Sequence, residues 1–216
     1  MKQTALSIIT MLTVFAAMPQ DTTYYPVLRQ GINKTSQGYN SENFLELANL
    51  CERISLVKTE EWLPYYYGAY AYINMSFLEK TAGKKDEYCI KAKILIEKAK
   101  ALNPQDSEID VLQALLCYAL MEITPMVNGP VYLPRSKKAL EAAKAKNPGN
   151  PRIYYLEGKS AMYMPAFMGG GKEAAIPLFE KALELFNKFT HASDVHPSWG
   201  RSDTANLLEE CKNANN

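Results

Sequence analysis

The spacing of apolar side chains predicts a chain built almost entirely of helices. From about residue 41 onward, apolar residues recur every three or four positions, which places them on one face of a helix. Alternation typical of β-strands is scarce, and Ala, Leu, Lys and Glu dominate after residue 86. The pattern predicts helices over residues 41–56, 61–79, 86–102, 107–123, 135–146, 151–162, 172–189 and 203–213.

A motif of small and large residues recurs in three of these helices. A small residue is followed four positions later by a large apolar one, three later by alanine, and five later by proline or, in the last copy, asparagine. Small side chains allow two helices to approach closely, and proline ends a helix because it lacks an amide donor. The three copies are Ala92-Ile96-Ala99-Pro104, Ser136-Leu140-Ala143-Pro148 and Ala175-Phe179-Ala182-Asn187.

These spacings resemble the tetratricopeptide repeat (TPR), in which a second helix carries A-x3-F-x2-A followed by proline. The best match is the segment 173–185, which contains Ala175, Phe179 and Ala182, and the resemblance spans roughly residues 60–187. It implies an all-α fold, a TPR-like superhelical stack of antiparallel helix hairpins. The helices at 41–56 and 203–213 are expected to act as capping helices for this stack.

The N-terminal region predicts export. Met1 and Lys2 precede an apolar run over residues 5–17, and Pro19 and Gln20 follow it, the pattern of a secretory signal peptide. A buried first helix is the alternative. We expect a signal peptide at residues 1–20, a mobile or loosely docked N-terminal arm at 21–40, and a helical repeat domain at 41–213. The segment 150–172 also resembles exported bacterial repeat proteins, which implies a periplasmic or cell-surface location in a Gram-negative bacterium.

Charge and the reactive residues exclude several classes of function. The formal net charge is +1, so no electrostatic feature favours nucleic acid or an anionic membrane surface. The four cysteines are expected to be buried thiols, with Cys51 and Cys89 as the only conceivable disulfide. No catalytic serine or cysteine motif occurs, so we expect no enzyme, no catalytic residues and no cofactor.

Two further motifs could form an anion site or a metal site, but a structural role explains each of them better. Glycines 169–171 before Lys172 could cradle an anion, but a tight helix entry also requires glycine. His191, Asp194 and His196 could ligate a metal, but a fourth ligand and helical spacing are missing. We expect a structural turn, a solvated loop and no metal site.

The resemblance also implies a candidate binding groove. In TPR proteins the first helix of each hairpin lines the concave face, and the equivalent positions here are mostly aromatic. Aromatic side chains are enriched at interfaces because they bury a large area at low entropic cost. The alternative is that these aromatic residues pack against a capping helix and long insertions. The predicted groove residues are Trp62, Tyr65, Tyr72, Glu108, Tyr118, Arg152, Tyr155, Lys159 and Met162.

Three functions are compatible with such a groove. The preferred one is an exported protein-interaction scaffold that binds a peptide or protein partner in the concave groove, without an integral membrane segment after processing. The alternatives are a structural subunit of an envelope assembly and a small-molecule or glycan binder. A concave face filled by the loop over residues 125–134 would favour the alternatives.

Overall fold

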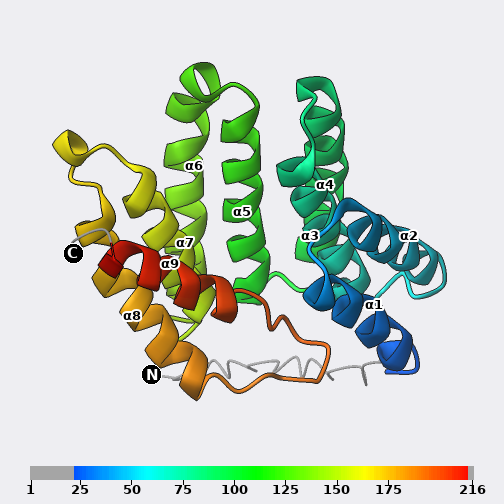
Figure 1. The fold of residues 1–216 in the computed structure, drawn as a ribbon. Coiled ribbons are helices and arrows are strands. Elements are labelled where there is room, and N and C mark those ends of the chain that lie inside the picture. Colours follow the sequence, from blue (N-terminus) through cyan, green and yellow to red (C-terminus); the bar gives the residue numbers. More distant parts are fainter. Residues whose placement is uncertain (1–21, 214–216) are drawn as a thin grey trace, which may run out of the picture.

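The computed structural model describes residues 22–213, and this part of the chain is all-helical, as predicted (Figure 1). Most helices begin and end close to the predicted positions; α1 is not predicted and α6 begins earlier than predicted. The helices are α1 (Tyr25–Gln37), α2 (Ser41–Val57), α3 (Trp62–Leu78), α4 (Ala82–Leu102), α5 (Ser107–Ile123), α6 (Pro125–Lys146), α7 (Pro151–Tyr163), α8 (Lys172–Lys188) and α9 (Arg201–Asn213), with a 3-10 turn, η1 (Ala166–Met168).

The helices form antiparallel hairpins that stack side by side. Helix α3 pairs with α4, α5 with α6, and α7 with α8, while α4 packs on α5 and connects the first two hairpins (Figure 1). The first helices α3, α5 and α7 also contact one another in sequence order, so they form the inner face of the stack. Helix α2 covers α3 at one end and α9 covers α8 at the other.

The recurring small residues lie where the helices approach most closely. Ala99, Ala143 and Ala182 are fully buried. In the third hairpin, a Cβ atom at Gly158 would lie 2.5 Å from the ring of Phe179, so only glycine fits there. The repeat motif therefore predicts the packing between paired helices.

We expect Ala143→Leu to lower the free energy of unfolding by about 1–3 kcal/mol, because added methyl groups must displace packed neighbours. Ala145 lies on the same helix but is exposed, so Ala145→Leu is the matched control and should have little effect. Urea denaturation measures both. Equal unfolding midpoints for the two variants would refute the close contact at Ala143.

The predicted N-terminal arm differs from the structure. Residues 25–37 form helix α1, which packs on α2 through the fully buried Leu28, and Arg29 forms an ion pair with Asp194 near the other end of the chain. An apolar stripe and a proline in its first turn favour this helix. The predicted signal peptide at residues 1–20 lies outside the described residues.

The expected loop over residues 125–134 is instead the first half of α6. Pro125 occupies the first turn of the helix, where its missing amide has no cost. Pro130 and Pro134 lie inside the helix four positions apart, and both are exposed, so water can satisfy the carbonyl groups that lose a partner. This segment therefore does not fill the concave face.

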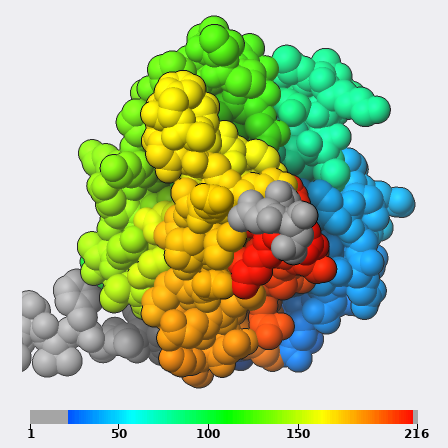
Figure 2. Space-filling view, turned by 60° about the vertical axis from the view of Figure 1, so that its left-hand side comes forward, coloured from blue at the N-terminus to red at the C-terminus, as the bar shows by residue number. Residues whose placement is uncertain are grey.

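A different segment covers the concave face. Residues 189–200, which we call the strap, leave α8 and cross toward the N-terminal helices before α9 begins (Figure 1). Val195 of the strap is 1% exposed. In Figure 2, α9 (red) lies between α8 (orange) and the N-terminal helices (blue).

The remaining sequence motifs have structural roles. Gly169 and Gly171 have positive φ angles and form the turn before α8, as expected for a helix entry. The cysteines at 51, 89, 117 and 211 are all buried free thiols, so Cys51 and Cys89 do not form a disulfide. None of the described helices is both long and apolar enough to cross a bilayer.

Candidate functional site

A buried ion pair fastens the strap to the inner face. The Nη1 atom of Arg152 (α7) lies 2.8 Å from Oε1 of Glu108 (α5), and both side chains are almost completely buried. Asn150 donates a second hydrogen bond to the same carboxylate at 2.8 Å. The other end of the Arg152 guanidinium donates to the carbonyl oxygen of Pro197 in the strap. Burial raises the pKa of Glu108, and the positive charge of Arg152 opposes this shift.

Trp199 of the strap occupies the middle of the concave face. Its ring stacks on Tyr70 with the centroids 5.3 Å apart, and its Nε1 atom donates to the Tyr66 hydroxyl at 2.8 Å. Tyr155 contacts the same indole edge-on, and Arg152 lies 5.4 Å from its centroid. The strap thus inserts an aromatic side chain where an external ligand was expected.

The histidines of the strap do not form a metal site. The Nε2 atom of His196 lies 3.3 Å from Oδ2 of Asp106, and its ring packs edge-on against Trp62. His191 is exposed, as expected for a solvated loop, whereas His196 is half-buried. Within residues 22–213, no three His, Cys, Asp or Glu side chains gather closely enough to hold a metal ion.

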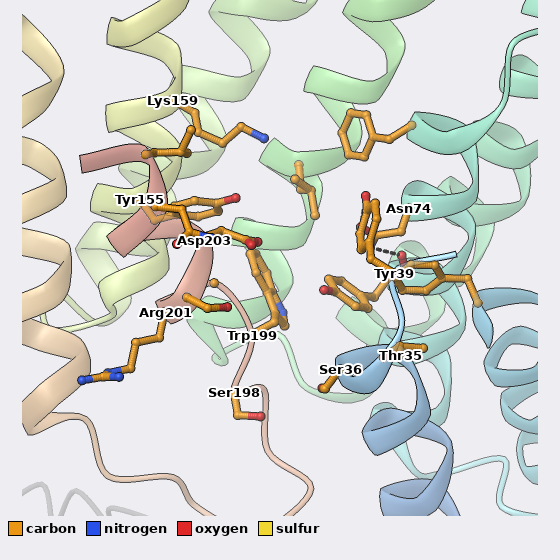
Figure 3. A pocket seen from close by; sticks show the side chains of 18 of the residues that line it. Thr35, Ser36, Tyr39, Asn74, Tyr155, Lys159, Ser198, Trp199, Arg201 and Asp203 are labelled. Atoms are coloured by element: carbon orange, nitrogen blue, oxygen red, sulfur yellow. Dashed lines mark hydrogen bonds between the residues drawn. The ribbon is translucent and has the colours of Figure 1, made fainter. Parts of the chain in front are cut away.

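An open cleft of about 660 Å³ remains on the concave face. One wall consists of α7, the end of the strap and the start of α9, and the opposite wall of α1, α2 and α3 (Figure 3). Leu115 of α5 also lines it. Aromatic and polar side chains line it in similar numbers, and those used below are Tyr39, Tyr70, Asn74, Phe77, Tyr155, Lys159, Tyr163, Trp199, Arg201 and Asp203.

Polar contacts orient the wall formed by α1 to α3. The hydroxyl of Tyr39 donates to Oδ1 of Asn74 at 3.0 Å, and the amide of Asn74 donates to the carbonyl of Tyr70 at 2.8 Å (Figure 3). The ring of Tyr39 also packs edge-on against Phe44. Burial, together with the negative charges of Asp203 and Glu122, raises the pKa of Tyr39 to about 12, so this phenol is neutral.

Lys159 is the cation that points into the cleft. Its side chain extends from α7 across the gap in Figure 3, and its Nζ atom lies 5.7 Å from the centroid of Phe77 and 5.8 Å from that of Tyr155. Burial lowers the pKa of Lys159, and the charges of Glu122 and Asp203 oppose this. Arg201 points away from the gap and donates to Asn187 at 3.0 Å.

Only part of the predicted groove lies in this cleft. Tyr155 and Lys159 line it, but the other predicted residues do not. Trp62, Glu108, Arg152 and Met162 are buried beneath the strap or between helices. Tyr65 and Tyr72 are buried against α2 and the turn that follows it. The Tyr65 hydroxyl donates to the carbonyls of Ser55 and Thr59, and the Tyr72 hydroxyl donates to the Glu52 carboxylate. The Tyr118 hydroxyl donates to the carbonyl of Leu156 at 3.1 Å. Neighbouring helices and the strap thus occupy the space in front of most of these positions.

Several cleft residues are not among the predicted groove residues. Tyr39 precedes α2, Asn74 lies on α3 and Trp199 lies near the end of the strap. The sequence signal for Trp199 is an isolated tryptophan in a polar, proline-containing loop, a setting in which an aromatic residue rarely stays in water. No equivalent signal identifies Asn74, because its role depends on how α3 faces Tyr39.

The comparisons with known proteins find a likeness among the solved structures. No protein-family model matches the chain, and the search of curated proteins finds no match. Among solved structures, the chain is similar to the HusA haemophore from Porphyromonas gingivalis, with 30% sequence identity and a TM-score of 0.80. The similarity covers 92% of this chain and 98% of that chain.

Proposed function

The chain belongs to the family of the HusA haemophore, and on that basis we propose that it captures haem or a closely related porphyrin in the cleft. A haemophore is a haem-binding protein, and the likeness covers nearly the whole of both chains. From the sequence alone, a scaffold that binds a peptide is preferred and a small-molecule binder is the alternative; the proposal made here adopts that alternative. A peptide lying along the inner face would compete with the strap, which is fixed there by Arg152 and Trp199.

The aromatic cleft is the observation that carries the proposal. Small-molecule sites commonly enclose roughly 300–1,000 Å³ and are lined by apolar and aromatic side chains with a few polar groups. The cleft has a volume of about 660 Å³ and presents Tyr39 and Tyr70 on one side and Tyr155 and Trp199 on the other. A porphyrin is a flat aromatic disc, which offset or edge-on aromatic side chains contact favourably.

The lining residues favour a binding mode in which the protein contacts the porphyrin ring and does not ligate the iron of haem. The described residues that line the cleft include no histidine, cysteine or methionine, the usual axial ligands besides tyrosine. Tyrosine ligates iron as a phenolate, but burial raises the pKa values of four of the five tyrosines in the cleft, Tyr39, Tyr67, Tyr70 and Tyr155; the fifth, Tyr163, is 70% exposed. We therefore propose that haem and a metal-free porphyrin bind the cleft with similar affinity.

The remaining features of the proposal concern location and activity. A haem-capturing role outside the cytoplasm accords with the signal peptide predicted at residues 1–20 and with periplasmic or cell-surface localisation. We propose a binding protein without enzymatic activity, built from TPR-like hairpins. The repeat motif at Ala175, Phe179 and Ala182 supports that kinship.

Titration of the purified protein with haem and with metal-free protoporphyrin IX tests this function. We expect saturable binding of one equivalent of each, with quenching of tryptophan fluorescence, because Trp199 lines the cleft. Trp62→Phe is the matched control: Trp62 is buried away from the cleft, so the variant should retain the quenching. Absence of saturable binding to either compound would refute the proposed function.

A further inference from the structure

Lys159 is an amine with no polar partner of its own. Within residues 22–213, its Nζ atom has no carboxylate oxygen within 4.0 Å and no hydrogen bond, and its closest described contacts are the rings of Phe77 and Tyr155. Other lysines of the C-terminal hairpins do have acidic partners: Lys144 pairs with Glu157 and Lys172 with Glu210. Among the described residues, the ammonium group of Lys159 thus lies near ring faces and forms no ion pair.

The surroundings of Lys159 leave it as the cation available to a ligand. Arg201 lines the cleft, but its guanidinium points outward to Asn187. Asp203 and Glu122 act on Lys159 only at a distance and do not form an ion pair with it. Partial burial disfavours an unpaired charge, which is why the pKa of this amine is lowered. An anion that entered the cleft would relieve this cost.

We propose that Lys159 pairs with a carboxylate of the ligand and makes the cleft selective for planar aromatic compounds with free carboxylate arms. This inference rests on the proposed function, because it concerns the same cleft and the same class of ligand. The rings of Tyr155 and Trp199 would contact the flat core, while the amine reaches an acidic arm at its edge. Porphyrins with free propionate groups have this combination, and their esters lack the negative charge.

The test compares protoporphyrin IX with its dimethyl ester in the same mixed solvent. A hydrogen bond to a charged group in a partly buried site favours binding by about tenfold or more. We therefore expect the unmodified protein to bind the free acid at least about tenfold more tightly than the ester. Lys159→Met should weaken binding of the acid by about the same factor and leave the ester unchanged. Lys159→Arg should keep most of the preference, because it keeps the positive charge.

Lys91→Met is the matched control. Lys91 also lies over a tyrosine ring, 4.9 Å from the centroid of Tyr72, but it is exposed on α4 outside the cleft. Its variant should discriminate between acid and ester as the unmodified protein does. Circular dichroism and the urea midpoint establish that each variant is folded.

The outcomes separate the carboxylate inference from the proposed function. If the unmodified protein binds acid and ester equally, or if Lys159→Met still rejects the ester, the role of Lys159 is wrong while porphyrin capture stands. Equal weakening of both ligands by Lys159→Met would also overturn that role, because it would indicate a contact with the ring. If the unmodified protein binds neither compound, both proposals fail.

Discussion

Arg152→Met should destabilise the protein by about 3–5 kcal/mol, because it leaves the buried Glu108 carboxylate without its partner. The substitution also removes the hydrogen bond to Pro197 and the contacts of the guanidinium with Phe186, Phe189 and Trp199. The strap is thus expected to loosen together with the core. Urea denaturation at neutral pH, compared with the unmodified protein, measures the loss.

A pH series and a double variant isolate the charge as the cause. Burial raises the pKa of Glu108, and the charge of Arg152 is the strongest interaction that opposes this rise. Without Arg152, the folded protein therefore favours the protonated form of Glu108. A group with a raised folded pKa contributes stability at low pH and loses it as pH rises. Arg152→Met should therefore cost less at pH 5 than at pH 8, and Arg152→Met with Glu108→Met should be more stable than Arg152→Met alone. A loss that is independent of pH and unchanged in the double variant would contradict this account.

We expect Tyr39→Ala combined with Tyr163→Ala to lower haem affinity by several hundredfold. Truncating an aromatic side chain that anchors a ligand commonly costs about 2 kcal/mol or more, roughly thirtyfold for each residue. Tyr39 and Tyr163 lie on opposite walls of the cleft and are 57% and 70% exposed, so their truncation should leave the fold intact. Equilibrium titration with haem measures the effect.

Tyr154→Ala is the control for this pair. Tyr154 lies on α7 like Tyr163, but its hydroxyl donates to Pro148 at 3.1 Å and it does not line the cleft. Its variant should bind haem as the unmodified protein does. Truncation of Tyr65 and Tyr118, which the sequence placed in the groove, should lower stability and leave binding largely unchanged. Full haem affinity in Tyr39→Ala with Tyr163→Ala would show that the cleft is not the binding site.

Local sequence patterns predict the helices and their pairing because both depend on neighbouring residues. Helix periodicity identifies α2 to α5 and α7 to α9 within a few residues, and the motif around Ala99, Ala143 and Ala182 marks the close contacts inside each hairpin. Two helical segments are not predicted: residues 25–37, expected as an arm, form α1, and residues 125–134, expected as a loop, form the first half of α6. Its prolines, 125, 130 and 134, normally break helices, and here they lie in the first turn or on the exposed face.

The proposed binding site is less predictable because its shape depends on a segment distant in sequence. The register along α3, α5 and α7 includes Tyr155 and Lys159 among the predicted groove residues, and these two line the cleft. It does not reveal that the strap covers Glu108 and Arg152, since that contact joins residues more than forty positions apart. The sequence therefore predicts Arg152 as a ligand-binding residue, whereas in the structure its side chain binds Glu108 and the carbonyl of Pro197 in the strap.

The location of the bound ligand can be mapped directly by backbone amide chemical shifts. Metal-free protoporphyrin IX is the suitable probe, because it lacks the paramagnetic iron of haem. On its addition, we predict that the largest shift changes cluster at Tyr39, Asn74, Lys159 and Gly200, which line both walls of the cleft. Changes centred instead on the exposed apolar residues Ile90 and Ile94 of α4, or on Phe167 of η1, with the cleft amides unaffected, would contradict the account.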